Sequence, residues 1–303
     1  MRILDYLFAA RPMLQLPIWT VYLVSLHHQN VLTGESFDWM DLAVMLGISL
    51  LFSAAAFLNQ VYDYESDRIN RKVGFLQKGI LTRQQMIVAF VMVSVVALGA
   101  APLLSRYVLI LFAQFFVLAY IYSAPPLRLK DRAIGGFLAN AYGHGFLVAI
   151  AVLPGMPVFK ADLSIWSVPL YFALCVGATY ILTTIPDRAG DAASGKRTLG
   201  VVLGRAGALS AALFLMAASA YLAFLCEYAI LAYLSIIAVF LVLGCLMIPS
   251  DRPVLMAAKL PLLLLTFLAG YHYPMYLLFV VALIFGCRIY YFKRFGIVYP
   301  ELA

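Results

Sequence analysis

The sequence contains little charge for its length. Only 12% of its 303 residues are Asp, Glu, Lys or Arg, against about a quarter in ordinary soluble domains. Hydrophobic residues make up 65% of the chain, and the mean hydropathy is +0.97. A water-soluble protein of this composition would have too few polar side chains to cover its surface. The composition therefore excludes a soluble globular protein and indicates an integral membrane protein.

Cysteine is also scarce, and its spacing indicates neither a metal site nor a disulfide framework. The four cysteines are Cys175, Cys226, Cys245 and Cys287. Each lies in or beside an apolar run and no C-x-x-C pair occurs, so we interpret them as small hydrophobic residues. A cleavable signal peptide is not expected either, because Asp5 precedes the first apolar segment and Arg11-Pro12 interrupts it.

Apolar runs long enough to cross a bilayer recur along the whole chain. A helix needs about 20 apolar residues to cross the hydrocarbon, and nine segments qualify. They lie at roughly 12–29, 38–62, 83–104, 107–123, 133–154, 163–186, 206–225, 228–248 and 273–292. A shorter run at 254–270 contains Lys259 and Pro261, and is either a tenth crossing or a half-buried segment. The predicted fold is an all-α, polytopic transmembrane bundle of nine spans, with ten possible.

The basic residues lie almost entirely between these spans. The net charge of +7 therefore favours membrane topology over nucleic-acid binding, and no nucleic-acid partner is expected. With the N-terminus inside, the outer loops hold only Arg106 and Lys160. The inner loops hold twelve basic residues: Arg68, Arg71, Lys72, Lys78, Arg83, Arg128, Lys130, Arg132, Arg188, Lys196, Arg197 and Arg205. The positive-inside rule thus predicts a multi-pass protein of the cell membrane whose three long polar loops face the cytoplasm.

Two acidic motifs follow the second and sixth spans. In the first, Asn59, Asp63 and Asp67 are spaced four apart, so a continuing helix would align them in one slanting row. In the second, Asp187 and Asp191 are again four apart. The offset between the motifs is 124 residues for both aspartate pairs. We therefore expect one transmembrane domain over 1–303, built of two loosely repeated halves at about 1–130 and 131–303.

The paired carboxylates indicate a metal–phosphate site. Charged helix ends at a membrane surface are common, and a single Asp-x-x-x-Asp would be most simply a solvated face. Two such pairs on the same side would repel each other unless a cation neutralised them. Hard carboxylate ligands that share an ion with substrate phosphates are typical of Mg²⁺ sites. We therefore predict that Asp63, Asp67, Asp187 and Asp191 bind Mg²⁺.

Basic residues close to the acidic motifs complete the predicted site. Tyr122 to Lys130 reads YSAPPLRLK, and Gly195 to Leu199 reads GKRTL. Each Lys or Arg alone could serve topology or contact lipid headgroups. Beside the acidic pairs, Arg128, Lys130 and Lys196 are predicted to bind a diphosphate, because guanidinium and ammonium groups suit phosphate oxygens.

These motifs together resemble the UbiA-type intramembrane prenyltransferases. The family's first motif is matched by Asn59, Asp63 and Asp67, its second by Asp187, Asp191 and the stretch 195–199, and its Tyr-Ser-x-Pro-Pro signature by 122–130. Arg11-Pro12 also resembles the family's opening. The resemblance implies nine transmembrane helices around a central cavity that opens to the cytoplasmic side. It also implies Mg²⁺-dependent transfer of a prenyl group from an allylic prenyl diphosphate to a lipophilic acceptor in the bilayer, with Asn59 binding Mg²⁺ and the diphosphate beside the four aspartates.

The chemistry expected of the residues agrees with this resemblance. Ionising an allylic C–O bond requires fixed positive charge at the leaving diphosphate and a dry cavity for the allylic group. The Tyr122 ring is a candidate to face the developing positive charge, or else an interfacial tyrosine. Many family members that prenylate aromatic acids carry Pro-x-Arg-Pro after the first motif, which this chain lacks. Arg71 or Lys78 is a candidate substitute for that cation.

The acceptor stays open, between an aromatic quinone precursor and a glycerol lipid. His144 and Asn140, at membrane depth, could contact it, or could form a helix-packing hydrogen bond beside Gly143 and Gly145. A CDP-alcohol phosphotransferase is disfavoured, since the Asp-Gly-x-x-Ala-Arg stretch is missing. The alternative function is a transporter or a prenyl-diphosphate-binding protein without transferase activity. The acidic motifs lie at helix ends, however, and not at the bilayer midplane that transporter sites favour.

Overall fold

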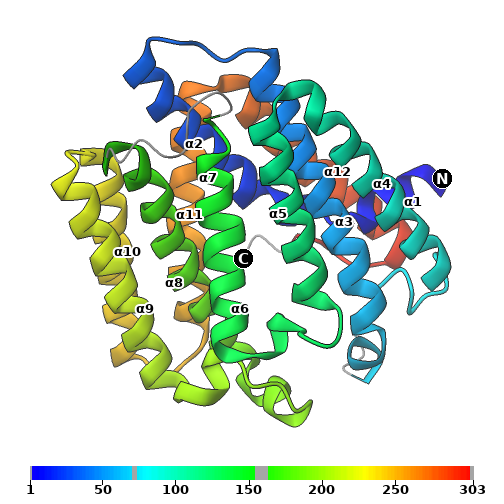
Figure 1. The fold of residues 1–303 in the computed structure, drawn as a ribbon. Helices are drawn as coiled ribbons and strands as arrows, with labels where there is room; N and C mark the ends of the chain where they lie inside the picture. The colour runs from blue at the N-terminus through cyan, green and yellow to red at the C-terminus, as the bar shows by residue number, and fades with distance from the viewer. Residues whose placement is uncertain (1, 70–73, 154–162, 301–303) are drawn as a thin grey trace.

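The computed structural model describes residues 2–69, 74–153 and 163–300 (Figure 1). Within these ranges the chain is helical apart from loops and one isolated β-bridge, which confirms the all-α prediction. In chain order the elements are α1 (Arg2–Ala9), η1 (Pro12–Gln15), α2 (Leu16–Thr33), α3 (Trp39–Ile69), α4 (Arg83–Leu104), α5 (Arg106–Ser123), η2 (Leu129–Asp131), α6 (Ala133–Asn140), η3 (Ala141–Leu147), α7 (Val148–Ile150), α8 (Leu163–Ala193), α9 (Leu199–Leu225), α10 (Ala229–Met247), α11 (Arg252–His272) and α12 (Pro274–Phe295).

Nine helices in the described part of the chain are long and apolar enough to span a membrane. They are α3, α4, α5, the continuous α6–η3–α7 unit and α8 to α12. The first apolar segment forms a bent pair instead, in which α1 and the η1–α2 unit meet at 42° and would add a tenth crossing. The run that the sequence left open, 254–270, is the full-length helix α11. Pro261 lies inside this helix, and Lys259 is exposed on it.

The bend in the first segment is at Arg11-Pro12. Arg11 has φ 54°, the left-handed conformation that non-glycine residues rarely adopt, and Pro12 begins η1. The short helix α1 then packs on the far end of α12. There Asp5 is 2% exposed and accepts hydrogen bonds from Arg294, at 3.0 and 3.1 Å, and from Tyr290 at 2.5 Å. The two ends of the described chain therefore lie close together, which agrees with ten crossings if the bent pair forms one span.

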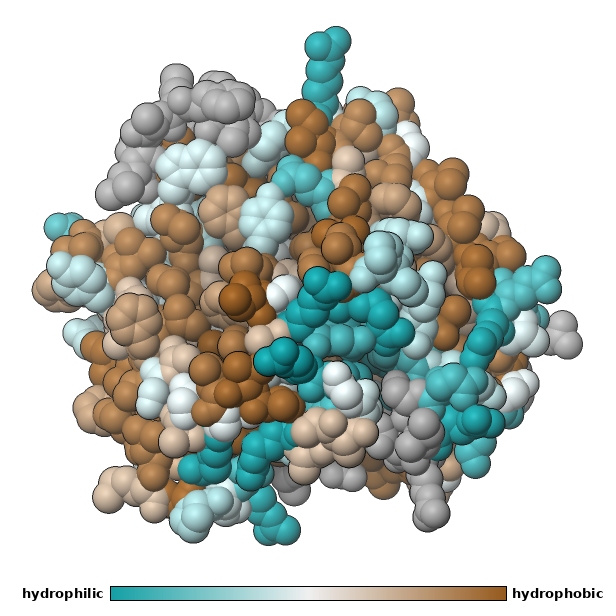
Figure 2. Space-filling model, turned by 60° about the horizontal axis from the view of Figure 1, so that its bottom comes forward, coloured by the Kyte–Doolittle hydropathy of each residue, from teal (hydrophilic) through white to brown (hydrophobic). Residues whose placement is uncertain are grey.

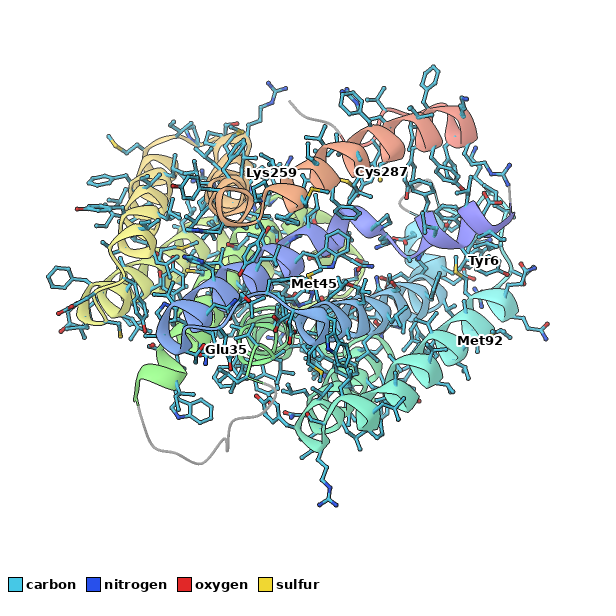
Figure 3. All side chains as sticks on the ribbon, turned by 90° about the horizontal axis from the view of Figure 1, so that it is seen from above. Tyr6, Glu35, Met45, Met92, Lys259 and Cys287 are labelled. Atoms are coloured by element: carbon cyan, nitrogen blue, oxygen red, sulfur yellow. The ribbon has the colours of Figure 1, made fainter. Side chains whose placement is uncertain are left out.

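The two longest helices, α3 and α8, place the acidic motifs. Each has 31 residues, and they begin 124 positions apart, at Trp39 and Leu163. Both run past the apolar part of the bundle and end beside the loops drawn at its bottom in Figure 1. Seen from above, Met45 of α3 lies near the middle of the molecule, whereas Met92 of α4 lies toward its edge and is 63% exposed (Figure 3). The helix that carries the first motif thus lies nearer the middle of the molecule than α4 does.

Side-chain polarity separates the bottom of the molecule from its sides. Viewed from that end, hydrophilic side chains gather in a central area surrounded by apolar ones (Figure 2). The exposed apolar side chains include Phe214, Phe224 and Phe240 of α9 and α10, each 68% exposed or more. Large apolar residues exposed in such number suit a lipid-facing surface. The polar area is where the loops after α3, α5 and α8 lie.

The α6–η3–α7 span contains a π-helical segment. Ala141 to Leu147 adopts i→i+5 hydrogen bonding within an otherwise α-helical span. Gly145 lies against α8, and a Cβ there would come within 2.6 Å of the Phe172 carbonyl oxygen. Gly143 lies against α5, where a Cβ would come within 2.5 Å of Leu118 Cδ2. These two contacts fix the rotation of the segment, and short π-helical segments are frequent at functional sites.

Candidate active site

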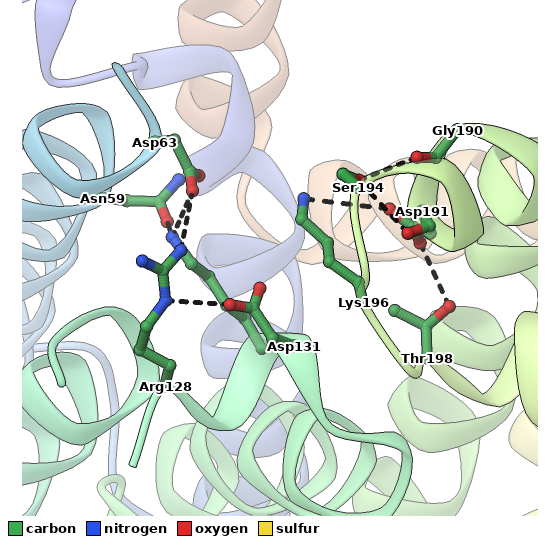
Figure 4. A network of polar contacts seen from close by, with 10 residues as sticks. Asn59, Asp63, Arg128, Asp131, Gly190, Asp191, Ser194, Lys196 and Thr198 are labelled. Carbon is green, nitrogen blue, oxygen red and sulfur yellow. Dashed lines mark hydrogen bonds and ion pairs between the residues drawn. The ribbon is translucent and has the colours of Figure 1, made fainter. Parts of the chain in front are cut away.

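The first acidic motif lies on a continuous helix. Because α3 extends to Ile69, Asn59, Asp63 and Asp67 share one face of it, as the four-residue spacing predicted. The Lys130 ammonium lies between two of these side chains. It donates to Asn59 Oδ1 at 2.8 Å and to Asp63 Oδ1 at 2.6 Å (Figure 4). Ser123 Oγ donates to the same Asn59 oxygen at 3.3 Å. Two oxygens of the motif thus converge on one cation.

Lys130 is more buried than the other two cations at the acidic motifs, Arg128 and Lys196. Its side chain is 8% exposed. Burial lowers the pKa of the Lys130 ammonium, and the Asp63 carboxylate beside it opposes that shift. The geometry therefore holds a poorly hydrated ammonium at the acidic motif, where phosphate oxygens could replace the water that it lacks.

Arg128 approaches the same oxygen of Asp63. Its Nη2 is 3.8 Å from Asp63 Oδ1, and its Nε donates to Asp131 Oδ2 at 2.8 Å. Arg128 has φ 40°, again the left-handed region. Left-handed strain in a non-glycine residue is concentrated at functional sites. The composition of the sequence gave no reason to select Asp131, although its i,i+3 spacing from Arg128 was a usable signal.

The second acidic motif lies at the end of α8. Lys196 Nζ is 3.8 Å from Asp191 Oδ1, and Thr198 Oγ1 donates to Asp191 Oδ2 at 3.0 Å. Thr198 is 4% exposed, and its role as a partner of Asp191 was not predicted. Asp187, one turn earlier, is exposed. The structure thus places the predicted Asp191–Lys196 pair together and leaves Asp187 open to solvent.

Backbone contacts join the two motifs. Arg197 N donates to the Asp131 carbonyl oxygen at 2.9 Å, and Arg132 and Arg197 form the isolated parallel bridge. The loop after α5, which supplies Arg128 and Lys130, is therefore fixed to the loop after α8. In Figure 4, Lys196 lies between the Asn59–Asp63 group and the Asp191 group. The polar site therefore joins Asp63 with Lys130, about 70 positions later in the sequence, and with Asp191, about 130 positions later.

A cavity of about 230 Å³ opens beneath the first motif. Asn59 and Tyr122 line it, together with His144 of η3. Its remaining lining residues are Ala10, Arg11, Leu14, Gln15, Ile18, Leu51, Phe52, Ala55, Ala56, Phe115, Leu118, Ala119, Ala139, Asn140 and Gly143. Asn140 Nδ2 donates to the Gly136 carbonyl at 2.8 Å and to the Tyr122 hydroxyl at 3.4 Å. The predicted site residues Asn59 and Tyr122 therefore connect the polar site with an apolar cavity.

One predicted cation among the described residues, Lys78, is not part of this arrangement. Lys78 is exposed in the loop before α4, and no side-chain contact joins it to the acidic motifs within the described residues. Arg71 lies outside the described residues. Their predicted contact with a diphosphate stays a prediction.

The residues present suit Mg²⁺ shared with a substrate. The donors are hard oxygens, and Asn59 and Asp63 already direct theirs at one cation, the Lys130 ammonium. In the described part of the chain, no three His, Cys, Asp or Glu side chains are close enough to hold an ion by themselves. A few carboxylates combined with phosphate oxygens is the usual arrangement for Mg²⁺ in proteins. The donor set therefore fits an ion completed by a diphosphate.

Comparison with known sequences gives the same result as the motifs. The sequence model of the UbiA prenyltransferase family matches residues 18–252. The chain is similar to the probable homogentisate phytyltransferase 2 of Oryza sativa subsp. japonica, with 29% identity over 55% of this chain and 46% of the relative. It is also similar to the digeranylgeranylglyceryl phosphate synthase of Thermococcus gammatolerans, with 28% identity over 60% and 63%. The chain thus spans less than two thirds of either relative.

Solved structures share the fold. A UbiA homolog from Archaeoglobus fulgidus bound to GPP and Mg²⁺ superposes with a TM-score of 0.68, at 19% identity over 88% of this chain and 98% of that one. A digeranylgeranylglyceryl phosphate synthase superposes with a TM-score of 0.67, at 18% identity over 88% and 96%. The family match covers most of the chain and includes the whole polar site. The chain therefore belongs to the UbiA prenyltransferase family.

Proposed function

We propose that this protein transfers a prenyl group from an allylic prenyl diphosphate to a lipophilic acceptor within the membrane, with Mg²⁺ bound to the donor. The observation that supports this proposal is the convergence of the two acidic motifs and the cations Arg128, Lys130 and Lys196 above an apolar cavity. A diphosphate and an apolar tail need those two environments side by side. Family membership is consistent with it.

Each group has a role at the donor. Asn59, Asp63, Asp67, Asp187 and Asp191 would hold Mg²⁺, which supplies positive charge to the departing diphosphate oxygens. Arg128, Lys130 and Lys196 bind the same oxygens and stabilise the charge that grows as the allylic C–O bond breaks. The bonding pair leaves with the diphosphate, a new bond forms between the allylic carbon and the acceptor, and the acceptor loses a proton.

The cavity has a separate role. Its apolar lining residues, among them Phe52, Leu51 and Phe115, exclude water from the allylic carbon. Tyr122 lies at the junction between the cavity and the polar site, where its ring would face the developing positive charge. Hydrolysis of the donor is thereby disfavoured relative to transfer.

The test is transfer by purified protein in lipid nanodiscs with Mg²⁺ and radiolabelled geranylgeranyl diphosphate. A panel of aromatic and glycerol-lipid acceptors is offered, and lipid product and released pyrophosphate are measured. We expect transfer that stops with EDTA and falls at least a hundredfold in Asp63→Ala. Glu65→Ala is the matched control, since Glu65 lies on the same helix but pairs with Arg68 and Arg83 at the surface.

The alternative function makes a different prediction in the same assay. A transporter or a binding protein would bind the donor without releasing pyrophosphate for any acceptor. Folded protein that shows no Mg²⁺-dependent donor binding would refute both the transferase and the diphosphate-binding alternative.

A further inference from the structure

His144 lines the cavity, and one of its ring nitrogens is buried without a partner among the described residues. Its Nδ1 is buried, and no hydrogen-bond partner for it occurs in the described part of the chain. The ring instead packs against Phe52, with 4.7 Å between centroids. A buried polar atom without a partner is destabilising, and native proteins retain few of them. Within the described residues Nδ1 therefore does not form the helix-packing hydrogen bond that was one of the two alternatives for this histidine. The ring lines the cavity and can bind a ligand there.

The backbone around His144 keeps it in this position. Gly145 packs on the backbone of α8, where a side chain is excluded, and Gly143 packs on the Leu118 side chain of α5. The π-helical turn places His144 between these contacts and among the cavity-lining residues. Rotation of the segment away from the cavity would drive one of the two glycine positions into a neighbouring helix.

The composition of the cavity wall restricts what could bind there. Most of the lining residues are small or aliphatic, and among them are three aromatic rings (Phe52, Phe115 and Tyr122) and the neutral polar groups of Asn140 and Gln15. Arg11 is the one Lys or Arg among the described lining residues. A phosphate monoester needs several cations to replace its water, and the other cations of the site, Arg128, Lys130 and Lys196, are at the acidic motifs. A flat ring with a hydroxyl group matches this wall better than a phosphoglycerol headgroup does.

We infer that His144 is a specificity-determining residue that hydrogen-bonds a ring hydroxyl of the acceptor, and that the acceptor is a hydroxylated aromatic compound. This inference rests on the proposed function and narrows its acceptor. Phe52 and Asn59 are two turns apart on α3, about 10 Å along the helix, so a ring held between His144 and Tyr122 lies next to the donor site. His144 acts here by binding and orienting the acceptor.

The first test compares kinetics in two substitutions. The acceptors are homogentisate, 1,4-dihydroxynaphthalene and geranylgeranylglyceryl phosphate, with geranylgeranyl diphosphate and Mg²⁺ as the donor. We expect transfer to at least one ring compound. His144→Phe should raise KM for that acceptor about tenfold or more and leave KM for the donor within about twofold, and His144→Gln should recover most of the loss. Unfolding midpoints close to the wild-type value establish that the variants fold.

The second test measures the chemical accessibility of the His144 imidazole directly. The chain has four histidines, and diethylpyrocarbonate modifies accessible neutral imidazoles. Modification of His144, measured by mass spectrometry on protein saturated with a thio-analogue of the donor, should fall when the ring acceptor is added. His27, His28 and His272 are internal controls, because they lie at the ends of α2 and α11, where His27 stacks on His272.

Three outcomes would overturn the inference. Transfer to geranylgeranylglyceryl phosphate and to neither ring compound would replace the aromatic acceptor with a phosphoglycerol lipid. An unchanged acceptor KM in His144→Phe, with unchanged modification of His144, would remove the residue from acceptor binding while the proposed function stands. Donor binding without transfer, and without protection of His144 by either ring compound, would reject the aromatic acceptor and the transferase activity together.

Discussion

At the scale of single residues, Lys130 combines burial with two oxygen partners. Its ammonium is poorly hydrated and lies against Asn59 and Asp63, so its removal takes a fixed positive charge from the diphosphate site. We expect Lys130→Gln to weaken donor binding about tenfold, or ~1.4 kcal/mol, at constant Mg²⁺. Equilibrium binding of radiolabelled geranylgeranyl diphosphate measures this. Lys259→Gln, at an exposed position of α11, removes the same charge away from the site and should bind the donor normally. If both variants lost the same donor affinity, the effect would come from the net charge of the protein and not from the position of Lys130.

Gly145 is the residue that permits η3 to approach α8. The Cβ of an alanine would come within 2.6 Å of the Phe172 carbonyl oxygen and 2.7 Å of Ala173 Cα, both backbone atoms that cannot rotate away. We expect Gly145→Ala to lower the free energy of unfolding by about 1–3 kcal/mol, as measured by thermal unfolding in detergent. The control is Gly99→Ala in α4, where no atom lies within 4 Å of the new Cβ. There the better helix propensity of alanine should leave stability unchanged or raise it by less than about 1 kcal/mol. An unaffected Gly145→Ala would refute the close packing.

At the scale of elements, Asp251 fixes the start of α11 to α8 and α9. Its carboxylate accepts from Arg188 at 2.8 Å and from Arg205 at 3.3 Å. The hydrogen bond from the Arg188 guanidinium is the main cause that holds the pKa of Asp251 below its usual value of 3.8. A carboxyl whose pKa is lower in the folded state adds stability above its unfolded pKa and loses that contribution as the pH falls through the folded pKa.

The substitution Asp251→Asn tests this linkage. We expect it to lower stability at pH 7 by about 1 kcal/mol or less, since the group is partly exposed and screened. The difference from wild type should shrink as the pH falls below 3.8. Unfolding midpoints of both proteins between pH 3 and 7 measure it. A difference that stays constant over that range would show that the ionised carboxylate is not the cause.

At the scale of the whole molecule, the positions of the basic loops predict which face is cytoplasmic. Lys78 lies in the loop before α4 at the polar end of the bundle, whereas Glu35 lies between α2 and α3. The membrane separates these positions if α3 spans it. In a cysteine-free variant in intact cells, we expect Glu35→Cys to react with a membrane-impermeant maleimide and Lys78→Cys to react only after lysis. The reverse pattern would place the site outside, against the positive-inside rule.

Much of the helical architecture could be predicted from the sequence, because span length, hydropathy and motif spacing are local properties. Asn59, Asp63 and Asp67 share a face of α3, as expected for residues spaced four apart on a helix. The first span and α11 were less predictable. The bend at Arg11-Pro12 depends on a left-handed residue, and α11 contains a lysine and a proline that weaken its apolar signal. The two-half organisation stays a proposal, supported by the equal lengths and the 124-residue offset of α3 and α8.

The sequence by itself determined that this protein is a membrane-embedded helical bundle with two acidic motifs and a set of cations, since composition and spacing suffice for that. Only the tertiary structure decided which of these residues meet. Lys130 reaches Asp63 from 67 positions away, and Arg197 bonds Asp131 from 66 positions away. The same holds for His144, whose orientation toward the cavity follows from glycine contacts with two other helices. Such contacts join parts of the chain that no local pattern relates, so they exist only once the helices have packed.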